Sequence, residues 1–160
     1  MEKRKKLIIY LFKISQEIYI RFFKRTLPWN ITSSELIKYP KNSFGYRMGF
    51  FLQVNGFELI PKVESHDALH VLAGMGTKVE DEIALQFLCF GNGKRSPYLL
   101  GVMMLGSLLL PEYFSYYITS YKKGIRLTPF YNWDFKALLN QDFNTLIFQI
   151  QPSIINHYKL

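Results

Sequence analysis

Apolar residues recur along much of the chain at intervals of three and four, the spacing that places side chains on one face of an α-helix. One such stripe lies near the N-terminus, ends before Pro28, and consists of Leu7, Leu11, Ile14, Ile18 and Phe22. A second stripe predicts a final helix from about Trp133 to Gln151, ended by Pro152. Its members are Phe135, Leu138, Leu139, Phe143, Leu146, Ile147 and Ile150.

Three or more helices are predicted between these stripes. A short helix is expected from about Ser43, ending at the stop signal Asn55-Gly56. The next runs from about Pro61 or Ser65 to Ala73 and ends at Gly74. After it, the sequence Thr77-Lys-Val-Glu80 fits a capping box that opens a further helix at Lys78. This helix is expected to bury Ile83, Leu85, Phe87 and Leu88.

Residues 98–110 are almost wholly apolar and predict a buried helix, too short for the ~20 residues of a membrane span. Its small residues Gly101, Gly106 and Ser107 would allow close approach of another helix or a ligand chain. No segment alternates apolar and polar residues as a half-buried strand would. The sequence therefore predicts an all-α, single-domain helical bundle with a central helix hairpin. It divides into a basic amphipathic N-terminal helix, residues 1–27, and a helical domain, residues 28–160.

Composition adds an apolar surplus to this picture. Apolar residues make up 49% of the 160 residues and charged residues only 20%, which leaves apolar surface for a lipid, a membrane or a partner subunit. A chain of this length buries about 68–70% of its unfolded surface in one domain. Cys89 is the only cysteine, so no intrachain disulfide can form, which fits a reducing compartment.

The positive charge is concentrated at the N-terminus. Residues 1–25 hold eight Lys/Arg and two Glu, a balance of +6, whereas the other 135 residues hold twelve Lys/Arg and ten Asp/Glu, a balance of +2. The body is thus a poor nucleic-acid surface, and no nucleic-acid partner is expected. No signal peptide is predicted, because the apolar run before Lys13 has only six residues and no small-residue cleavage site follows. The basic N-terminal helix either packs on the core or rests on an anionic bilayer.

The candidate chemistry lies in the central hairpin. His66 and His70 are four residues apart, so their imidazoles share one helix face about one turn apart, with Asp67 beside them. On one continuous helix Glu82 would lie about three turns beyond His70, but the break at Gly74 lets it face back from an antiparallel neighbour. His66, Asp67, His70 and Glu82 are therefore the candidate metal ligands.

Imidazole and carboxylate ligands suit a divalent metal, zinc above all, with iron, manganese, cobalt or magnesium as alternatives. Three or four protein ligands leave a position for water or substrate, where the metal acts as a Lewis acid. Asp67 can be a direct ligand, a proton shuttle or a group that orients a ligand.

Three familiar metal motifs fit less well. The zinc-protease pattern HExxH needs Glu where this chain has the shorter Asp67. The HD phosphohydrolase pattern needs an upstream His, and no His precedes His66. A di-iron carboxylate bundle needs repeated Glu-x-x-His pairs, and the chain has none.

The arrangement HDxxH, eleven residues, then Glu resembles the signature of the Coq-four family of coenzyme Q (ubiquinone) biosynthesis proteins. The likeness covers about residues 36–155, including the flanks YPKNSFGYRMG, HDALHVLAGMGTKVEDEIALQ and SYKKGIRLTPFYNWDFKALLNQDFNTLIFQI. Where the family usually has a large aromatic residue after the His-Asp pair, this chain has Ala68-Leu69, which leaves the substrate's identity open.

The resemblance implies an all-helical homodimer that binds a polyprenyl chain in an apolar groove beside the metal. It also implies metal-dependent C1 (oxidative) decarboxylation of a polyprenylated hydroxybenzoate, the work of a carbon–carbon lyase. The alternative is a non-catalytic isoprenoid-lipid-binding scaffold that organises other quinone-biosynthesis proteins. The expected location is cytoplasmic, peripheral on the inner face of the cytoplasmic membrane or on the equivalent mitochondrial matrix face, in contact with an anionic membrane surface.

The residues take expected roles in that chemistry. The metal held by His66, His70 and Glu82 would bind carboxylate or phenolate oxygens, and Asp67 would pass a proton to the ring as carbon dioxide leaves. The apolar segment 98–110 would take the tail, at about 0.8 kcal/mol for each buried methylene. A basic turn before the last helix is a candidate for binding an anionic head, or else a solvated loop; it contains Lys122, Lys123 and Arg126.

Overall fold

The computed structural model describes residues 2–22 and 26–151, which form α-helices and one short 3-10 helix. The elements are α1 Glu2–Phe22, α2 Ser33–Leu36, α3 Phe44–Asn55, α4 Glu64–Ala73, α5 Val79–Gly91, α6 Pro97–Leu109, η1 Pro111–Tyr113, α7 Phe114–Arg126 and α8 Phe143–Ile150. The described residues contain no strand, only an isolated bridge between Ser43 and Asp142. The predicted all-α class is confirmed.

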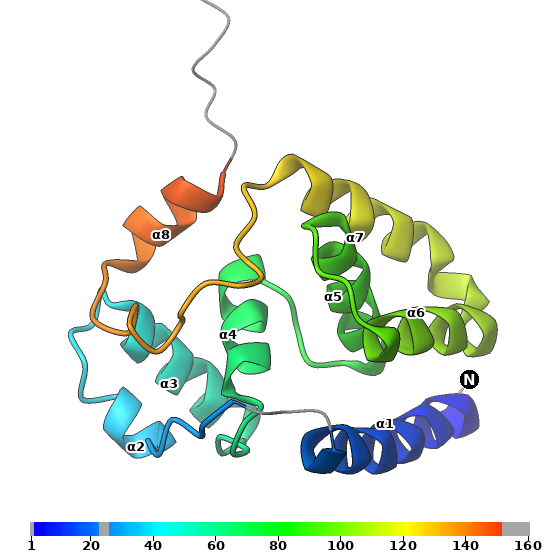
Figure 1. The fold of residues 1–160 in the computed structure, drawn as a ribbon, viewed down its shortest axis with the longest axis horizontal. Helices are drawn as coiled ribbons and strands as arrows, with labels where there is room; N and C mark the ends of the chain where they lie inside the picture. The colour runs from blue at the N-terminus through cyan, green and yellow to red at the C-terminus, as the bar shows by residue number, and fades with distance from the viewer. Residues whose placement is uncertain (1, 23–25, 152–160) are drawn as a thin grey trace, which may run out of the picture.

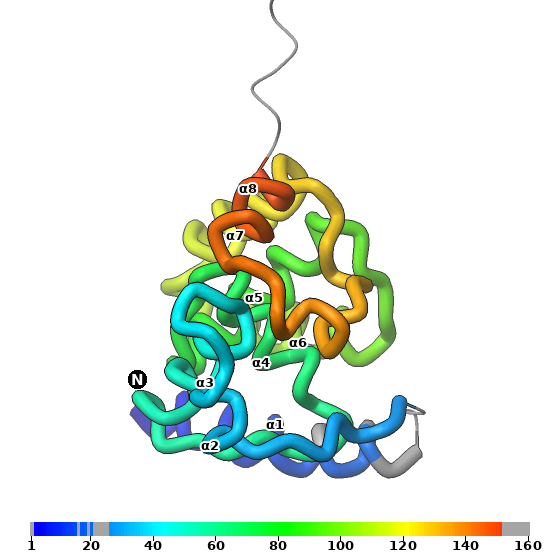
Figure 2. The backbone as a smooth tube through the Cα atoms, turned by 90° about the vertical axis from the view of Figure 1, so that its left-hand side faces the viewer, coloured from blue at the N-terminus to red at the C-terminus, as the bar shows by residue number. Residues whose placement is uncertain are grey.

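Helix α4 stands between two groups of helices (Figure 1). On one side lie α2, α3 and α8, and on the other lie α5, α6 and α7. Helix α1 and helix α8 lie at opposite ends of the molecule in both views (Figure 2). One buried cluster spans α3, α4, α5 and α8, and a second joins α1 to α5, α6 and α7. The central pair α4 and α5 is therefore packed from both sides, which fixes the hairpin predicted to carry the metal motif.

Local signals set the ends of the helices before this hairpin. Ser43 Oγ accepts a hydrogen bond from Tyr46 N at 3.2 Å, which caps the start of α3. Gly56 and Gly74 follow α3 and α4 with φ values of 67° and 63°, a left-handed conformation that favours glycine. These ends lie where the sequence predicts them.

The predicted cap at Thr77 is wrong by one residue. The N-cap position of α5 is Lys78, whose backbone N–H donates to Asp81 Oδ2 at 3.3 Å. The Thr77 hydroxyl instead donates to Asn55 Oδ1 at 3.1 Å and ties the turn to the end of α3. A tertiary partner thus takes the side chain that the local pattern assigned to capping.

Helices α5 and α7 cross with their backbones in contact. A Cβ added to Gly124 of α7 would overlap the carbonyl oxygen of Leu88, and one added to Gly91 of α5 would overlap that of Tyr121. Helix α7 was not predicted; its residues 122–126 were expected to form a turn. Its apolar and aromatic residues do follow helical spacing, but the glycine-mediated crossing that holds it against α5 is visible only in three dimensions.

We expect Gly124→Ala to lower the free energy of unfolding by about 3 kcal/mol, because the added methyl must force two backbones apart. The matched control is Gly101→Ala, at an exposed position of α6 with open space around the new methyl. That change should raise stability by about 0.5–1 kcal/mol. Chemical denaturation of both variants measures the difference, and a Gly124→Ala protein as stable as wild type would contradict the close crossing.

The predicted final helix is too long. Residues 131–141 form turns, and α8 begins only at Phe143. The cause is long-range: Gly45 N donates to the Leu139 carbonyl at 2.8 Å, and Phe44 N donates to the Gln141 carbonyl at 2.9 Å. The apolar residues Phe135 and Leu139 are nevertheless buried. The pattern therefore identified core residues correctly but not their secondary structure.

The apolar N-terminal stripe does not pack on the core. Leu7, Ile14 and Ile18 are 47%, 38% and 50% exposed, whereas Ile8 on another face of α1 is fully buried; the side chain of Phe22 lies outside the described set. Of the two alternatives given for this helix, packing on the core is therefore wrong for these three side chains. Ion pairs hold α1 in place: Lys5 Nζ lies 2.7 Å from Glu80 Oε2 of α5, and Arg4 is paired with Glu112 of η1 at 2.8 Å.

Helix α6 is buried on one face only, so the expectation of a buried helix is partly wrong. Leu99 and Val102 are buried, but Leu100, Met104 and Leu108 are exposed. Gly106 does allow close approach, because a Cβ there would overlap the side chain of Ile83. Within residues 2–22 and 26–151, no single helix has the length and hydropathy to cross a membrane; only 97–109 together with 111–126 would, and these two bend by 105°.

Candidate metal centre

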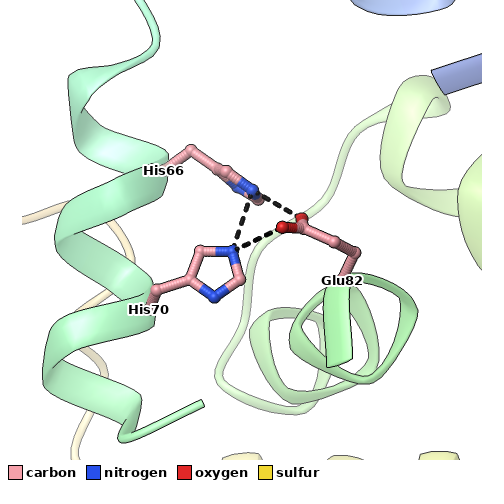
Figure 3. Close-up of side chains that lie close together, drawn as sticks. All are labelled: His66, His70 and Glu82. Atoms are coloured by element: carbon pink, nitrogen blue, oxygen red, sulfur yellow. Dashed lines mark hydrogen bonds and ion pairs between the residues drawn. The ribbon is translucent and has the colours of Figure 1, made fainter. Parts of the chain in front are cut away.

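Three predicted ligands converge between α4 and α5 (Figure 3). His66 and His70 extend from one face of α4, and Glu82 reaches toward them from the first turns of α5. His66 Nε2 lies 2.9 Å from Glu82 Oε2, and His70 Nε2 lies 3.2 Å from Glu82 Oε1. The two Nε2 atoms are 3.1 Å apart. One potential ligand atom from each residue lies within 4.8 Å of the others, a geometry that could hold a metal ion.

The donor set can be satisfied by protons on the rings or by a cation at its centre. Two imidazole nitrogens that face each other cannot both present lone pairs without repulsion, and a carboxylate adds negative charge beside them. Either protons on the rings or a divalent cation resolves this arrangement. Nitrogen and oxygen atoms that converge in this way are the ligands that zinc and other divalent metals take in proteins, so the residues fit the predicted metal.

Packing orients the His70 ring. Its side chain is 2% exposed and stacks on Phe51 of α3, with ring centroids 5.8 Å apart. Its Nδ1 atom is buried and has no hydrogen-bond partner among the described residues. Stacking on Phe51 therefore helps to direct Nε2 toward Glu82.

The three groups also shift one another's pKa values. Burial opposes the charged form of Glu82. Hydrogen bonds and charge from His66 and His70 outweigh the effect of burial and lower the Glu82 pKa to about 2. Burial likewise lowers the His70 pKa, but the hydrogen bond to Glu82 and its charge outweigh burial and raise it overall. The carboxylate is thus kept ionised, as a metal ligand must be.

Asp67 lies outside the converging group. It is half-buried and lines the cavity described below, and burial raises its pKa to about 6, against the opposing charges of His66 and His70. The structure brings together His66, His70 and Glu82 but does not add Asp67 to them as a fourth ligand atom. A carboxyl group with this pKa holds a proton for part of the time near neutral pH, which suits proton transfer.

A cavity of about 880 Å³ opens beside the site, a volume typical of pockets that enclose small molecules. His66, Asp67 and Glu82 form part of its wall, and most of the remaining wall is apolar. Helix α1 contributes one side of the cavity through Ile9, Phe12, Lys13 and Ile20. Helix α1 therefore encloses the cavity as well as presenting an exposed stripe.

The predicted basic residues lie elsewhere. Lys122, Lys123 and Arg126 belong to α7 rather than to a turn, and none of them lines the cavity. Lys123 Nζ donates a hydrogen bond to the Ala73 carbonyl at 2.8 Å and so closes the C-terminal end of α4. Its contact supports the helix that carries the histidines, not the cavity.

The sequence interpretation assigned no role at the site to several polar residues of the cavity wall, among them Lys13, Gln86 and Lys94. Lys13 reaches it from α1, Gln86 from α5 and Lys94 from the loop before α6. A signal existed for Gln86, which follows Glu82 by one helical turn and so shares its face. For Lys13 and Lys94 only the assembled fold provides the proximity.

Comparison with solved structures shows a shared fold. The chain matches no protein-family model and no curated protein. It does resemble the crystal structure of a proposed ubiquinone biosynthesis protein from Nostoc punctiforme, with a TM-score of 0.64 and 19% sequence identity. The match covers 92% of this chain and 81% of the other. The two proteins share a fold.

Proposed function

We propose that this protein acts in ubiquinone biosynthesis as a metal-dependent decarboxylase that removes the carboxyl group at carbon 1 of a polyprenylated hydroxybenzoate. The observation that carries the proposal is the convergence of His66, His70 and Glu82 beside a largely apolar cavity of about 880 Å³, whose wall includes His66 and Glu82. Support comes from the ubiquinone-related name of the Nostoc punctiforme protein that shares the fold, and from the HDxxH-x₁₁-E pattern.

The residues suggest a division of labour. A divalent metal, zinc or another ion of similar preference, would be held by His66, His70 and Glu82 and would supply Lewis-acid chemistry toward carboxylate or phenolate oxygens. Asp67, whose pKa burial raises to about 6, can hold a proton at the cavity wall for part of the time near neutral pH. As the bond between ring and carboxyl group breaks, its electron pair passes to the ring carbon, which takes the proton from Asp67, and carbon dioxide leaves. Replacement of the carboxyl by a hydroxyl group would need an oxidant such as dioxygen in addition.

The apolar part of the cavity would take the isoprenoid tail. Ile9, Phe12 and Ile20 from α1 and Val102 from α6 lie in its wall. Each methylene that the tail buries contributes about 0.8 kcal/mol, so a few isoprene units outweigh the cost of ordering the chain. His66, Asp67, Glu82 and Gln86, from α4 and α5, form one polar part of the wall, where the head group would bind. Other polar residues, such as Lys13 and Lys94, lie elsewhere in the wall.

Helix α1 would place this cavity at a membrane. Its exposed apolar residues Leu7, Tyr10, Ile14 and Ile18 are flanked by lysines, as in helices that lie in the plane of a bilayer. Each lysine near an anionic surface adds about 1 kcal/mol to binding. Sedimentation of the protein with anionic and with neutral vesicles tests this proposal. If the protein sediments with neither kind of vesicle, the result counts against it.

In a second candidate function, the same cavity binds a lipid but catalyses no reaction. An isoprenoid-binding scaffold that organises quinone-biosynthesis enzymes is favoured by the apolar lining, which suits a lipid whether or not Asp67 transfers a proton. The Asp67→Asn variant, described in the Discussion, distinguishes the enzyme from the scaffold.

Lipid extraction of protein purified from its own host tests the proposed ligand. We expect a prenylated aromatic acid in the extract, in an amount approaching one per chain. Ile60→Trp, which adds bulk at the cavity wall, should lower that amount several-fold, whereas Val54→Trp, at an exposed position outside the wall, should not. An extract that contains only bulk phospholipid, equal for all three proteins, would contradict the proposal.

A further inference from the structure

Gln86 is a buried polar residue of the cavity wall that the proposed chemistry does not use. Its side chain lies on α5, and the residue is only 7% exposed. Gln86 also lines the cavity beside the metal ligands. A carboxamide in this position is shielded from bulk water on the protein side and open to whatever occupies the cavity.

No described residue pairs with the Gln86 carboxamide, although its neighbours on α5, Glu82 and Asp81, both make side-chain hydrogen bonds. Buried amides in proteins are nearly always paired, because an unpaired donor or acceptor loses its hydration without compensation. The Gln86 carboxamide atoms are not among the buried unpaired atoms of the described residues, so they are open to the cavity. A ligand that displaces water there must offer them a polar group in return, or the binding free energy is reduced.

The position of Gln86 defines where that partner lies. Gln86 follows Glu82 by four residues, so both side chains lie on one face of α5, about 6 Å apart along the helix axis. This separation is about the distance between the first atoms of two substituents that lie para to each other on a benzene ring. A ring whose carboxyl group meets the metal ligands would therefore place its para substituent beside Gln86.

We propose that Gln86 determines substrate specificity by hydrogen bonding to an oxygen para to the carboxyl group of the ligand's aromatic ring. The carboxamide oxygen can accept from a phenol, and the amide N–H groups can donate to a phenolate or an ether oxygen, so one side chain recognises each of these oxygens. An aromatic acid that lacks the oxygen leaves the carboxamide unpaired and binds more weakly. This inference rests on the proposed function, because it takes the cavity to hold a prenylated aromatic acid.

The test compares three geranylated benzoates in zinc-loaded protein: one with a hydroxyl para to the carboxyl group, one with it meta, and one with none. Wild-type protein is expected to bind the para compound about 10- to 100-fold more tightly than the compound without a hydroxyl. Gln86→Met, which keeps the side chain's length but removes its polar atoms, should reduce this preference to less than about threefold. The matched control is Gln53→Met, at an exposed position of α3 outside the cavity wall, which should keep the wild-type preference.

The outcomes distinguish this inference from the proposed function. If wild type binds the three acids but does not favour the para compound, or if Gln86→Met weakens all three by the same factor, the role of Gln86 is refuted while the proposed function stands. If wild type binds none of them, the proposed function fails first. The wild-type comparison needs no variant, so the inference remains testable even if Gln86→Met does not fold.

Discussion

Replacing Glu82 by glutamine is expected to weaken zinc binding by more than about 100-fold, because loss of a direct ligand should exceed the 10- to 100-fold cost typical of losing a group that only orients a ligand. The carboxamide is nearly the same size as the carboxylate, so the packing of α5 should survive. His70→Ala is expected to have a similar effect on affinity. It should also destabilise the fold, because the ring is buried against Phe51.

Competition against a chelator of known affinity measures these changes. The matched control is Glu17→Gln, which removes one carboxylate from the exposed surface of α1, outside the cavity wall, and should leave zinc affinity within about twofold. If Glu82→Gln binds zinc as tightly as the control does, the carboxylate is not a ligand and the proposed centre is wrong.

Replacing Asp67 by asparagine is expected to lower the turnover of a prenylated hydroxybenzoate by about 10²–10⁴-fold, the usual contribution of a positioned proton donor. Asparagine has the shape of aspartate but cannot release a proton. Metal content and ligand affinity should therefore stay close to wild type, since Asp67 lies outside the converging ligand group.

The same variant decides between the enzyme and the scaffold. Decarboxylation is followed as release of labelled carbon dioxide, with metal content measured on the same sample. Asp67→Asn protein that supports normal quinone synthesis would refute the catalytic role of Asp67 and favour the scaffold. Loss of metal together with activity would instead show that Asp67 helps to hold the ion.

The central hairpin could be predicted because its signals are local. Two histidines one turn apart fix a shared face, and Gly74 in a left-handed conformation ends the helix beside them. The position of Glu82 follows from the short connection between two antiparallel helices. Only the cap of α5 was misplaced, because Thr77 finds a partner on α3.

The rest depends on contacts between distant parts of the chain. Residues 131–141 carry a helical pattern but form turns, since backbone N–H groups of α3 take the carbonyls of Leu139 and Gln141. Lys123 was assigned to an anionic head group, whereas the end of α4 is its actual partner. Hydrophobic spacing also cannot say which stripe of a helix is covered. It therefore left two alternatives open for α1 and did not predict the exposed face of α6.

Crystals of the zinc-loaded protein, with anomalous diffraction recorded at the zinc edge, test the central claim most directly. The account predicts one strong peak about 2.0–2.2 Å from His66 Nε2, from His70 Nε2 and from a carboxylate oxygen of Glu82. A zinc-loaded crystal with no peak between these three side chains, or with its peak elsewhere on the chain, would contradict it.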